Sequence, residues 1–137
     1  MKKLIVTIEA RMNSSRLPGK VMMEISKKPL LIHLIENLKS LDEIDDIVVA
    51  TTTNLKDDII CKYLDKMNVS YFRGDEMDVL GRVTKASIKF EADVVIQLTA
   101  DNPLIDPKII EKGIRIFLES DFDCVSNTFT KSYPSGM

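Results

Sequence analysis

Short runs of aliphatic and β-branched residues alternate along this chain with longer segments whose apolar residues recur at helical spacing. The strand-like runs are Lys3–Ile8, Ile47–Thr51, Val69–Phe72 and Asp93–Leu98. The helical segments begin near Pro29, Leu55, Asp78 and Asp106. Strands that are apolar on both faces and separated by helices are typical of a mainly parallel sheet covered on both sides. The sequence therefore predicts a Rossmann-like, three-layer α/β/α fold.

Individual residues refine this pattern. Asn54 is expected to cap the helix from Leu55 to Met67, and the pair Asp106-Pro107 to begin the helix that ends at Leu118. We expect Ile59 and Leu80 to be buried by their helices. The segment Cys124–Ser126 is expected to begin a fifth strand, and Tyr133–Gly136 to form a loop.

The size and charge of the chain limit what it binds. The 137 residues are enough for one domain, residues 1–137, with a full hydrophobic core. The net charge of -2 gives no general attraction to nucleic acid or to an anionic membrane, and no segment is long and apolar enough to span a bilayer. Cys61 and Cys124 form no metal-binding motif, so we expect a reducing cytoplasm.

One loop concentrates positive charge. The stretch EARMNSSRLPGK, from Glu9 to Lys20, carries Arg11, Arg16 and Lys20 directly after the first strand. If the sheet begins with strand order 3-2-1-4, this loop faces the end of the fourth strand, which is followed by Asp101. Strand order reverses at that point, and ligands of open α/β sheets bind there. Basic side chains that face a carboxylate suggest a polyphosphate with a divalent metal, Mg²⁺ on Asp101.

The familiar nucleotide-binding fingerprints are absent. There is no G-x-G-x-x-G, and SRLPGKV has valine where a P-loop requires serine or threonine. A P-loop NTPase and a typical dinucleotide-binding domain are therefore disfavoured.

Several motifs in order resemble one family. The stretch ARMNSSRLPGK resembles the signature of the spore-coat polysaccharide (SpsF-like) cytidylyltransferases, relatives of the enzymes that make CMP-activated acidic sugars. The resemblance continues through KPLLIHLIENL, IVVATTTN, VSYFRGDEMDVLGR, LTADNPLIDP and YPSG, and so covers essentially the whole chain. It implies a nucleotidyltransferase of the nucleotide-diphospho-sugar transferase (glycosyltransferase-A-like) fold.

The resemblance also assigns roles to residues. Arg11, Arg16 and Lys20 match the catalytic basic positions of the triphosphate loop, and Asp101 matches the metal-binding aspartate. The full set implied to bind nucleotide is Ala10, Arg11, Ser14, Ser15, Arg16, Lys20, Thr52, Asn54, Arg73 and Asp78.

The implied reaction transfers CMP from CTP to a sugar or sugar acid and releases pyrophosphate, with Mg²⁺ as cofactor, in cell-surface or spore-coat polysaccharide biosynthesis. A second copy of the chain is an expected partner. Relatives continue well past YPSG, so the resemblance implies that the family's C-terminal portion is absent. Two alternatives stay open: a nucleotide-sugar-dependent glycosyltransferase that uses Asp121 and Asp123, and a non-catalytic nucleotide-binding fragment.

The sequence also departs from the family pattern. Glu9 stands where glutamine is common, Asn13 replaces a glycine, and residues 26–29 replace a turn that contains glycine. None of these changes removes a charge that the mechanism requires.

Overall fold

A four-stranded parallel sheet forms the centre of the molecule. The structure is a computed structural model that describes residues 2–128. The strand order is β5-β4-β1-β6, which is the predicted order 3-2-1-4. The bounds of these strands are β1 Leu4–Glu9, β4 Asp46–Thr52, β5 Ser70–Gly74 and β6 Val94–Thr99. All three strand pairings are parallel, with Ile5 opposite Asp46 on one side and opposite Val95 on the other.

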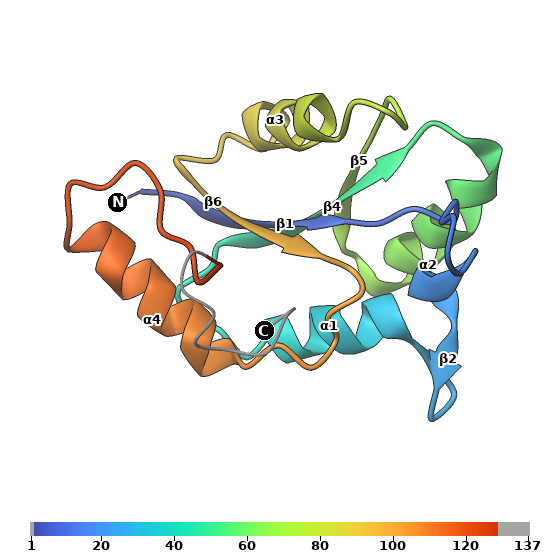
Figure 1. Ribbon diagram of the computed structural model, residues 1–137, viewed down its shortest axis with the longest axis horizontal. Coiled ribbons are helices and arrows are strands. Elements are labelled where there is room, and N and C mark those ends of the chain that lie inside the picture. The colour runs from blue at the N-terminus through green and yellow to red at the C-terminus, as the bar shows by residue number, and fades with distance from the viewer. Residues whose placement is uncertain (1, 129–137) are drawn as a thin grey trace.

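Helices cover both faces of the sheet, as the three-layer prediction requires. Figure 1 shows α3 (Val79–Lys89) alone on one face, and α1 (Leu30–Leu38), α2 (Asp58–Met67) and α4 (Pro107–Leu118) on the other. The connections between parallel strands run through these helices. The loops that follow β1 and β6 therefore emerge at the same edge of the sheet.

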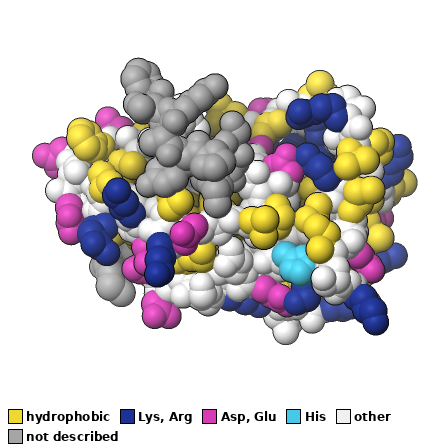
Figure 2. All heavy atoms as spheres, turned by 60° about the horizontal axis from the view of Figure 1, so that its bottom comes forward, with side chains coloured by type: hydrophobic (Ala, Val, Ile, Leu, Met, Phe, Trp, Pro, Cys, Tyr) yellow, Lys and Arg dark blue, Asp and Glu magenta, His cyan; other side chains and the backbone are white. Residues whose placement is uncertain are grey.

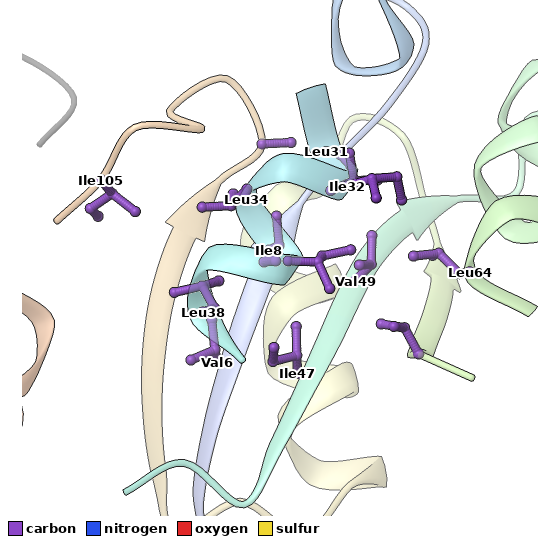
Figure 3. Packing of buried hydrophobic residues seen from close by; sticks show 14 of the residues in the cluster. Val6, Ile8, Leu31, Ile32, Leu34, Leu38, Ile47, Val49, Leu64 and Ile105 are labelled. Carbon is purple, nitrogen blue, oxygen red and sulfur yellow. The ribbon is translucent and has the colours of Figure 1, made fainter. Parts of the chain in front are cut away.

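The larger core lies between the sheet and the face formed by α1, α2 and α4. Figure 3 shows Leu34 and Leu38 of α1 packed against Val6 and Ile8 of β1, all fully buried. A smaller cluster under α3 contains Ile5. Successive residues of β1 thus point into different cores, which explains why the strand is apolar on both faces.

Capping residues begin the helices where the sequence predicts them. The Asn54 side chain accepts from the Lys56 N–H at 3.0 Å and caps a 3-10 helix, η2 (Leu55–Asp57), that leads into α2. Asp106 accepts from the Lys108 N–H at 2.9 Å and caps α4. Both caps satisfy a backbone donor that has no partner inside the helix.

The strand β6 differs from the expected buried strand. Its residues alternate, with Val94 buried and Val95, Gln97 and Thr99 exposed. The reason is the position of α3, which packs on β5, β4 and β1. One face of β6 therefore remains exposed in the described residues.

Three local predictions are wrong. Ile59 of α2 is 42% exposed and Leu80 of α3 is 73% exposed, because helical periodicity does not fix how wide a stripe the sheet covers. The segment Cys124–Ser126 forms no strand. The predicted loop Tyr133–Gly136 lies outside the described residues.

A small hairpin was not predicted. After a 3-10 turn, η1 (Lys20–Met22), the strands β2 (Glu24–Ile25) and β3 (Lys28–Pro29) pair antiparallel. Ser26 and Lys27 form the turn with φ of 52° and 66°, the backbone of a type I′ turn. Glycine or asparagine usually occupies such positions, so Ser26 and Lys27 do not indicate a hairpin in the sequence.

The surface carries a mixture of charges. Figure 2 shows acidic, basic and hydrophobic side chains interspersed over the visible face. No helix among residues 2–128 has the length and hydrophobicity that a bilayer crossing requires.

Candidate functional site

The loops after β1 and β6 meet at the carboxyl edge of the sheet, as predicted. The Lys20 ammonium at the start of η1 lies 2.7 Å from Oδ2 of Asp101. The Thr99 hydroxyl donates to the other oxygen of Asp101 at 2.7 Å. The hydrogen bond from Lys20, with that from Thr99, lowers the pKa of Asp101. The carboxylate is therefore ionised at neutral pH and available as a hard oxygen ligand.

The cationic loop itself is held in a defined shape. Gly19 has a φ of 73°, which favours glycine, and its N–H donates to the Met12 carbonyl at 2.8 Å. The Leu17 N–H donates to the Ser14 hydroxyl at 3.3 Å. These contacts close residues 12–19 into a compact turn.

An open cavity of about 380 Å³ lies beside this loop. Its lining residues are Arg11, Asn13, Ser14, Ser15, Pro18, Lys56 and Glu76. Arg11, Ser14 and Ser15 were predicted, and the structure brings them together. Lys20 and Asp101 lie outside this lining, and Arg16 is exposed on the same loop.

Glu76 lines the cavity and was not predicted from the sequence. Its carboxylate accepts from the side-chain amides of Asn13 at 2.8 Å and Asn54 at 3.1 Å, and lies 3.6 Å from the Arg11 guanidinium. The two amide hydrogen bonds, with the charge of Arg11, lower the pKa of Glu76. The loop after β5 is thereby joined to the loop after β1. Glu76 stands beside Asp75 in the stretch FRGDEMD, and nothing in that acidic run indicates which carboxylate reaches the loop after β1.

Arg73 is engaged within the protein. Its guanidinium pairs with Asp58 at 2.7 Å and donates to the carbonyls of Thr52 at 2.7 Å and Asn54 at 2.8 Å. These contacts fasten β5 to the turn between β4 and α2. Its predicted contact with nucleotide stays a prediction.

The remaining predicted residues are dispersed along neighbouring elements. Asp78 caps α3 by accepting from the Gly81 N–H at 2.8 Å. The Ala10 N–H lies 3.4 Å from the Ala50 carbonyl at the end of the β1–β4 pairing. Thr52 is fully buried, and its hydroxyl donates to Asp57.

Two buried charged residues support the site and were also missed. Arg82, 2% exposed, donates to the carbonyls of Ala50 at 3.1 Å and Asp75 at 2.8 Å, and so holds the loop after β5 against β4. Its burial lowers the pKa of its guanidinium, and the charge of Glu9 opposes that shift. Asp57 is 1% exposed and accepts from the Met12 N–H at 2.7 Å.

The donor set near Asp101 suits a metal that arrives with phosphate. Among residues 2–128 there is no group of three side chains of the His, Cys, Asp and Glu types that could hold an ion without further ligands. Mg²⁺ commonly binds one or two carboxylates and takes its other ligands from water and phosphate oxygens. One ionised carboxylate beside a cationic loop fits that pattern.

Comparison with known proteins identifies the family. The family model for cytidylyltransferases matches residues 5–134. This chain belongs to the cytidylyltransferase family. Among curated relatives, the chain is 40% identical over 124 residues to an uncharacterized protein of Methanocaldococcus jannaschii, covering 90% of this chain and 51% of that protein. It is 32% identical to the spore coat polysaccharide biosynthesis protein SpsF of Bacillus subtilis, covering 100% of this chain and 58% of SpsF.

Solved cytidylyltransferases share the fold. A cytidylyltransferase from Leptospira borgpetersenii superposes with a TM-score of 0.83 at 35% identity, covering 88% of this chain and 51% of that chain. A CMP:2-keto-3-deoxy-manno-octonic acid synthetase complexed with CTP superposes with a TM-score of 0.75 at 26% identity, covering 85% of this chain and 48% of that chain. The chain thus spans about half the length of the related proteins it matches. The predicted family and α/β fold are confirmed.

Proposed function

We propose that this chain forms the nucleotide-binding part, residues 1–137, of an enzyme that transfers CMP from CTP to a sugar or sugar acid and releases pyrophosphate. The observation that carries the proposal is the 2.7 Å contact between Lys20 and Asp101. It joins the cationic loop to the carboxylate at one sheet edge, where a polyphosphate and its metal have complementary charges.

The names of related proteins support cytidine and a sugar acid. One superposed synthetase was solved with CTP, and an Escherichia coli 3-deoxy-manno-octulosonate cytidylyltransferase is 32% identical over 111 residues. The relative SpsF supports a role in polysaccharide biosynthesis. A spore-coat pathway, a cytoplasmic location and a second copy of the chain as partner remain parts of this proposal.

The protein's own contribution would be positioning and charge stabilisation. Lys20 and Arg16 would stabilise the charge on the departing pyrophosphate, and Arg11 the charge that develops around the α-phosphate. Ser14 and Ser15 would present backbone N–H groups to the same anion. Preorganised donors of this kind supply much of the rate enhancement in phosphoryl transfer.

Asp101 would hold Mg²⁺ at this edge. The metal, when bound, would neutralise phosphate charge and orient the phosphate oxygens. Lys20 now occupies one oxygen of Asp101 and would have to turn toward the phosphates for the metal to bind.

A thermal-shift panel of CTP, UTP, ATP and GTP, each with and without Mg²⁺, tests the proposal. Selective stabilisation by CTP with Mg²⁺ is expected, because a ligand that binds the native state raises the melting temperature. Equal shifts with all four nucleotides, or none, would contradict the assignment to cytidine.

A product assay separates the alternatives. Pyrophosphate release supports nucleotidyl transfer, nucleoside diphosphate release indicates a glycosyltransferase, and CTP binding without product indicates a non-catalytic fragment. In a preparation that turns over, Lys20→Ala should lower the rate about 10²–10³-fold. Unchanged pyrophosphate release would remove Lys20 from the catalytic site.

A further inference from the structure

Asp57 is a buried carboxylate that the proposed chemistry does not use. It is 1% exposed and lies behind the cationic loop. One oxygen accepts from the Met12 N–H at 2.7 Å. The other accepts from the Thr52 N–H at 3.3 Å and from the Thr52 hydroxyl. This single side chain therefore joins the loop after β1 to the end of β4.

These contacts are different from those of an ordinary helix cap. Asp57 occupies the N-cap position of α2, where aspartate usually accepts from the helix's own first N–H groups. Its side chain makes no such hydrogen bond. The preceding turn is capped by Asn54 instead. The carboxylate is thus directed away from the helix and toward Met12, 45 positions earlier in the sequence.

A buried carboxylate such as that of Asp57 requires partners that compensate its charge. No basic side chain forms an ion pair with it among residues 2–128. The charges of Arg73 and Arg82 act on Asp57 only from beyond ion-pair distance, so well-aligned hydrogen bonds must offset most of its lost hydration. Hydrogen bonds to a carboxylate are also stronger than those between neutral groups. The charge therefore holds Met12 and Thr52 more firmly than a neutral side chain would.

The two anchored residues lead directly to the cavity lining. Asn13, next to Met12, donates to Glu76 at 2.8 Å. On the other side, the Thr52 hydroxyl accepts from the Asn54 N–H at 3.1 Å, and the Asn54 side chain donates to Glu76 at 3.1 Å. A closed path of hydrogen bonds and chain links thus runs from Asp57 to Asn13 and Glu76, which both line the cavity, and back through Asn54.

We propose that Asp57 is a positioning residue of the nucleotide site, which sets the loop carrying Arg11, Arg16 and Lys20 at a defined height above the carboxyl end of β4. This role rests on the proposed function, because the loop is taken to bind the triphosphate. Asp57 acts through the loop backbone and does not itself contact the nucleotide.

Amide hydrogen exchange without ligand tests the anchoring step. Asp57→Asn keeps the side-chain volume but presents an NH₂ group where Thr52 donates. We expect the protection of the Met12 amide and its loop neighbours to fall about tenfold. The control is Asp46→Ala, which removes a carboxylate at the other end of β4, where Asp46 accepts from Ser70 at 3.0 Å. Equal loop protection in both variants would overturn the proposal.

Calorimetry with CTP and Mg²⁺ tests the functional step. The dissociation constant of CTP should rise about tenfold in Asp57→Asn and stay within about twofold in Asp46→Ala. Wild-type protein that does not bind CTP would contradict the proposed function, whereas the exchange comparison would still decide whether Asp57 anchors the loop. Normal CTP affinity in Asp57→Asn would contradict the positioning role alone.

A second variant covers the case in which Asp57→Asn does not fold. Thr52→Val removes only the hydroxyl, which both donates to Asp57 and accepts from Asn54. A smaller loss of loop protection in the same residues is expected. Unchanged exchange and CTP affinity in this variant would also overturn the proposal.

Discussion

The ammonium of Lys20 and the carboxylate of Asp101, 81 positions apart in the sequence, lie 2.7 Å from each other at the carboxyl edge of the sheet. Each group is the other's counterion in the structure. Both are also the groups that the proposed chemistry assigns to the triphosphate and its metal. In that proposed chemistry, binding of the metal nucleotide would replace this ion pair by two others, Lys20 with a phosphate and Asp101 with the metal.

Asp101→Asn should raise the affinity for pyrophosphate in the absence of divalent metal. Lys20 loses its counterion and the anion loses a repelling charge, so a gain of about threefold to tenfold is expected, equivalent to about 1 kcal/mol. With Mg²⁺ the variant should bind pyrophosphate more weakly than the wild type, because the carboxylate that would hold the metal is missing. Isothermal titration calorimetry in EDTA and in Mg²⁺ measures both affinities.

Asp121→Asn is the matched control for that measurement. Asp121 is exposed in the segment after α4 and belongs to the alternative Asp121–Asp123 metal pair. The Asp121→Asn substitution should leave the pyrophosphate affinity unchanged both in EDTA and in Mg²⁺. A loss of the Mg²⁺ response here, with a normal response in Asp101→Asn, would favour the glycosyltransferase alternative.

The Lys20–Asp101 pair should stabilise the fold in a pH-dependent way. The folded-state pKa of Asp101 lies below its ordinary value of 3.8, chiefly because Lys20 donates to it. Since the folded state binds the proton less tightly, the stabilisation is present above that value and is lost as pH falls through the lowered pKa. Both side chains are partly exposed, so the coupling should be below about 1 kcal/mol.

A double-mutant cycle with Lys20→Met and Asp101→Asn measures this coupling. Urea unfolding at neutral pH and at successively lower pH values gives the coupling free energy. A coupling that grows on acidification would contradict the sign of the pKa shift.

Arg82→Lys should destabilise the protein by about 1–3 kcal/mol. Arg82 is buried and donates to the carbonyls of Ala50, Asp75 and Glu76, at 3.1, 2.8 and 3.3 Å. A lysine ammonium cannot reproduce the planar fork of a guanidinium and would leave carbonyls without donors. Urea unfolding compares this variant with Arg115→Lys on the exposed side of α4. Equal stability of the two variants would show that the three hydrogen bonds contribute little.

Lys27→Gly should stabilise the protein by about 0.5–1 kcal/mol. Lys27 has a φ of 66° in the turn between β2 and β3, and glycine adopts this backbone without steric cost. Thermal unfolding measures the gain. Lys39→Gly is the control, because Lys39 has a right-handed helical φ of −64° and should gain nothing. A loss of stability in Lys27→Gly would indicate that its side chain has an unrecognised contact.

Sequence patterns were most accurate where local structure decides the outcome. The period of the apolar residues located the four strands of the parallel sheet, and the caps Asn54 and Asp106 located helix starts. They were less accurate at surfaces: Leu80 and the exposed face of β6 depend on how far α3 reaches across the sheet.

The sequence by itself determined the layered α/β fold and placed two charged loops at one edge of the sheet, because parallel strands joined by helices must end on the same side. That these loops are neighbours depends on the strand order β5-β4-β1-β6, which the structure shows. Only the tertiary structure decided which polar groups pair there. Glu76 lies 63 positions from its partner Asn13, and Asp57 lies 45 positions from Met12. Such contacts depend on the path of each loop in space, and no periodicity or cap in the chain encodes that path.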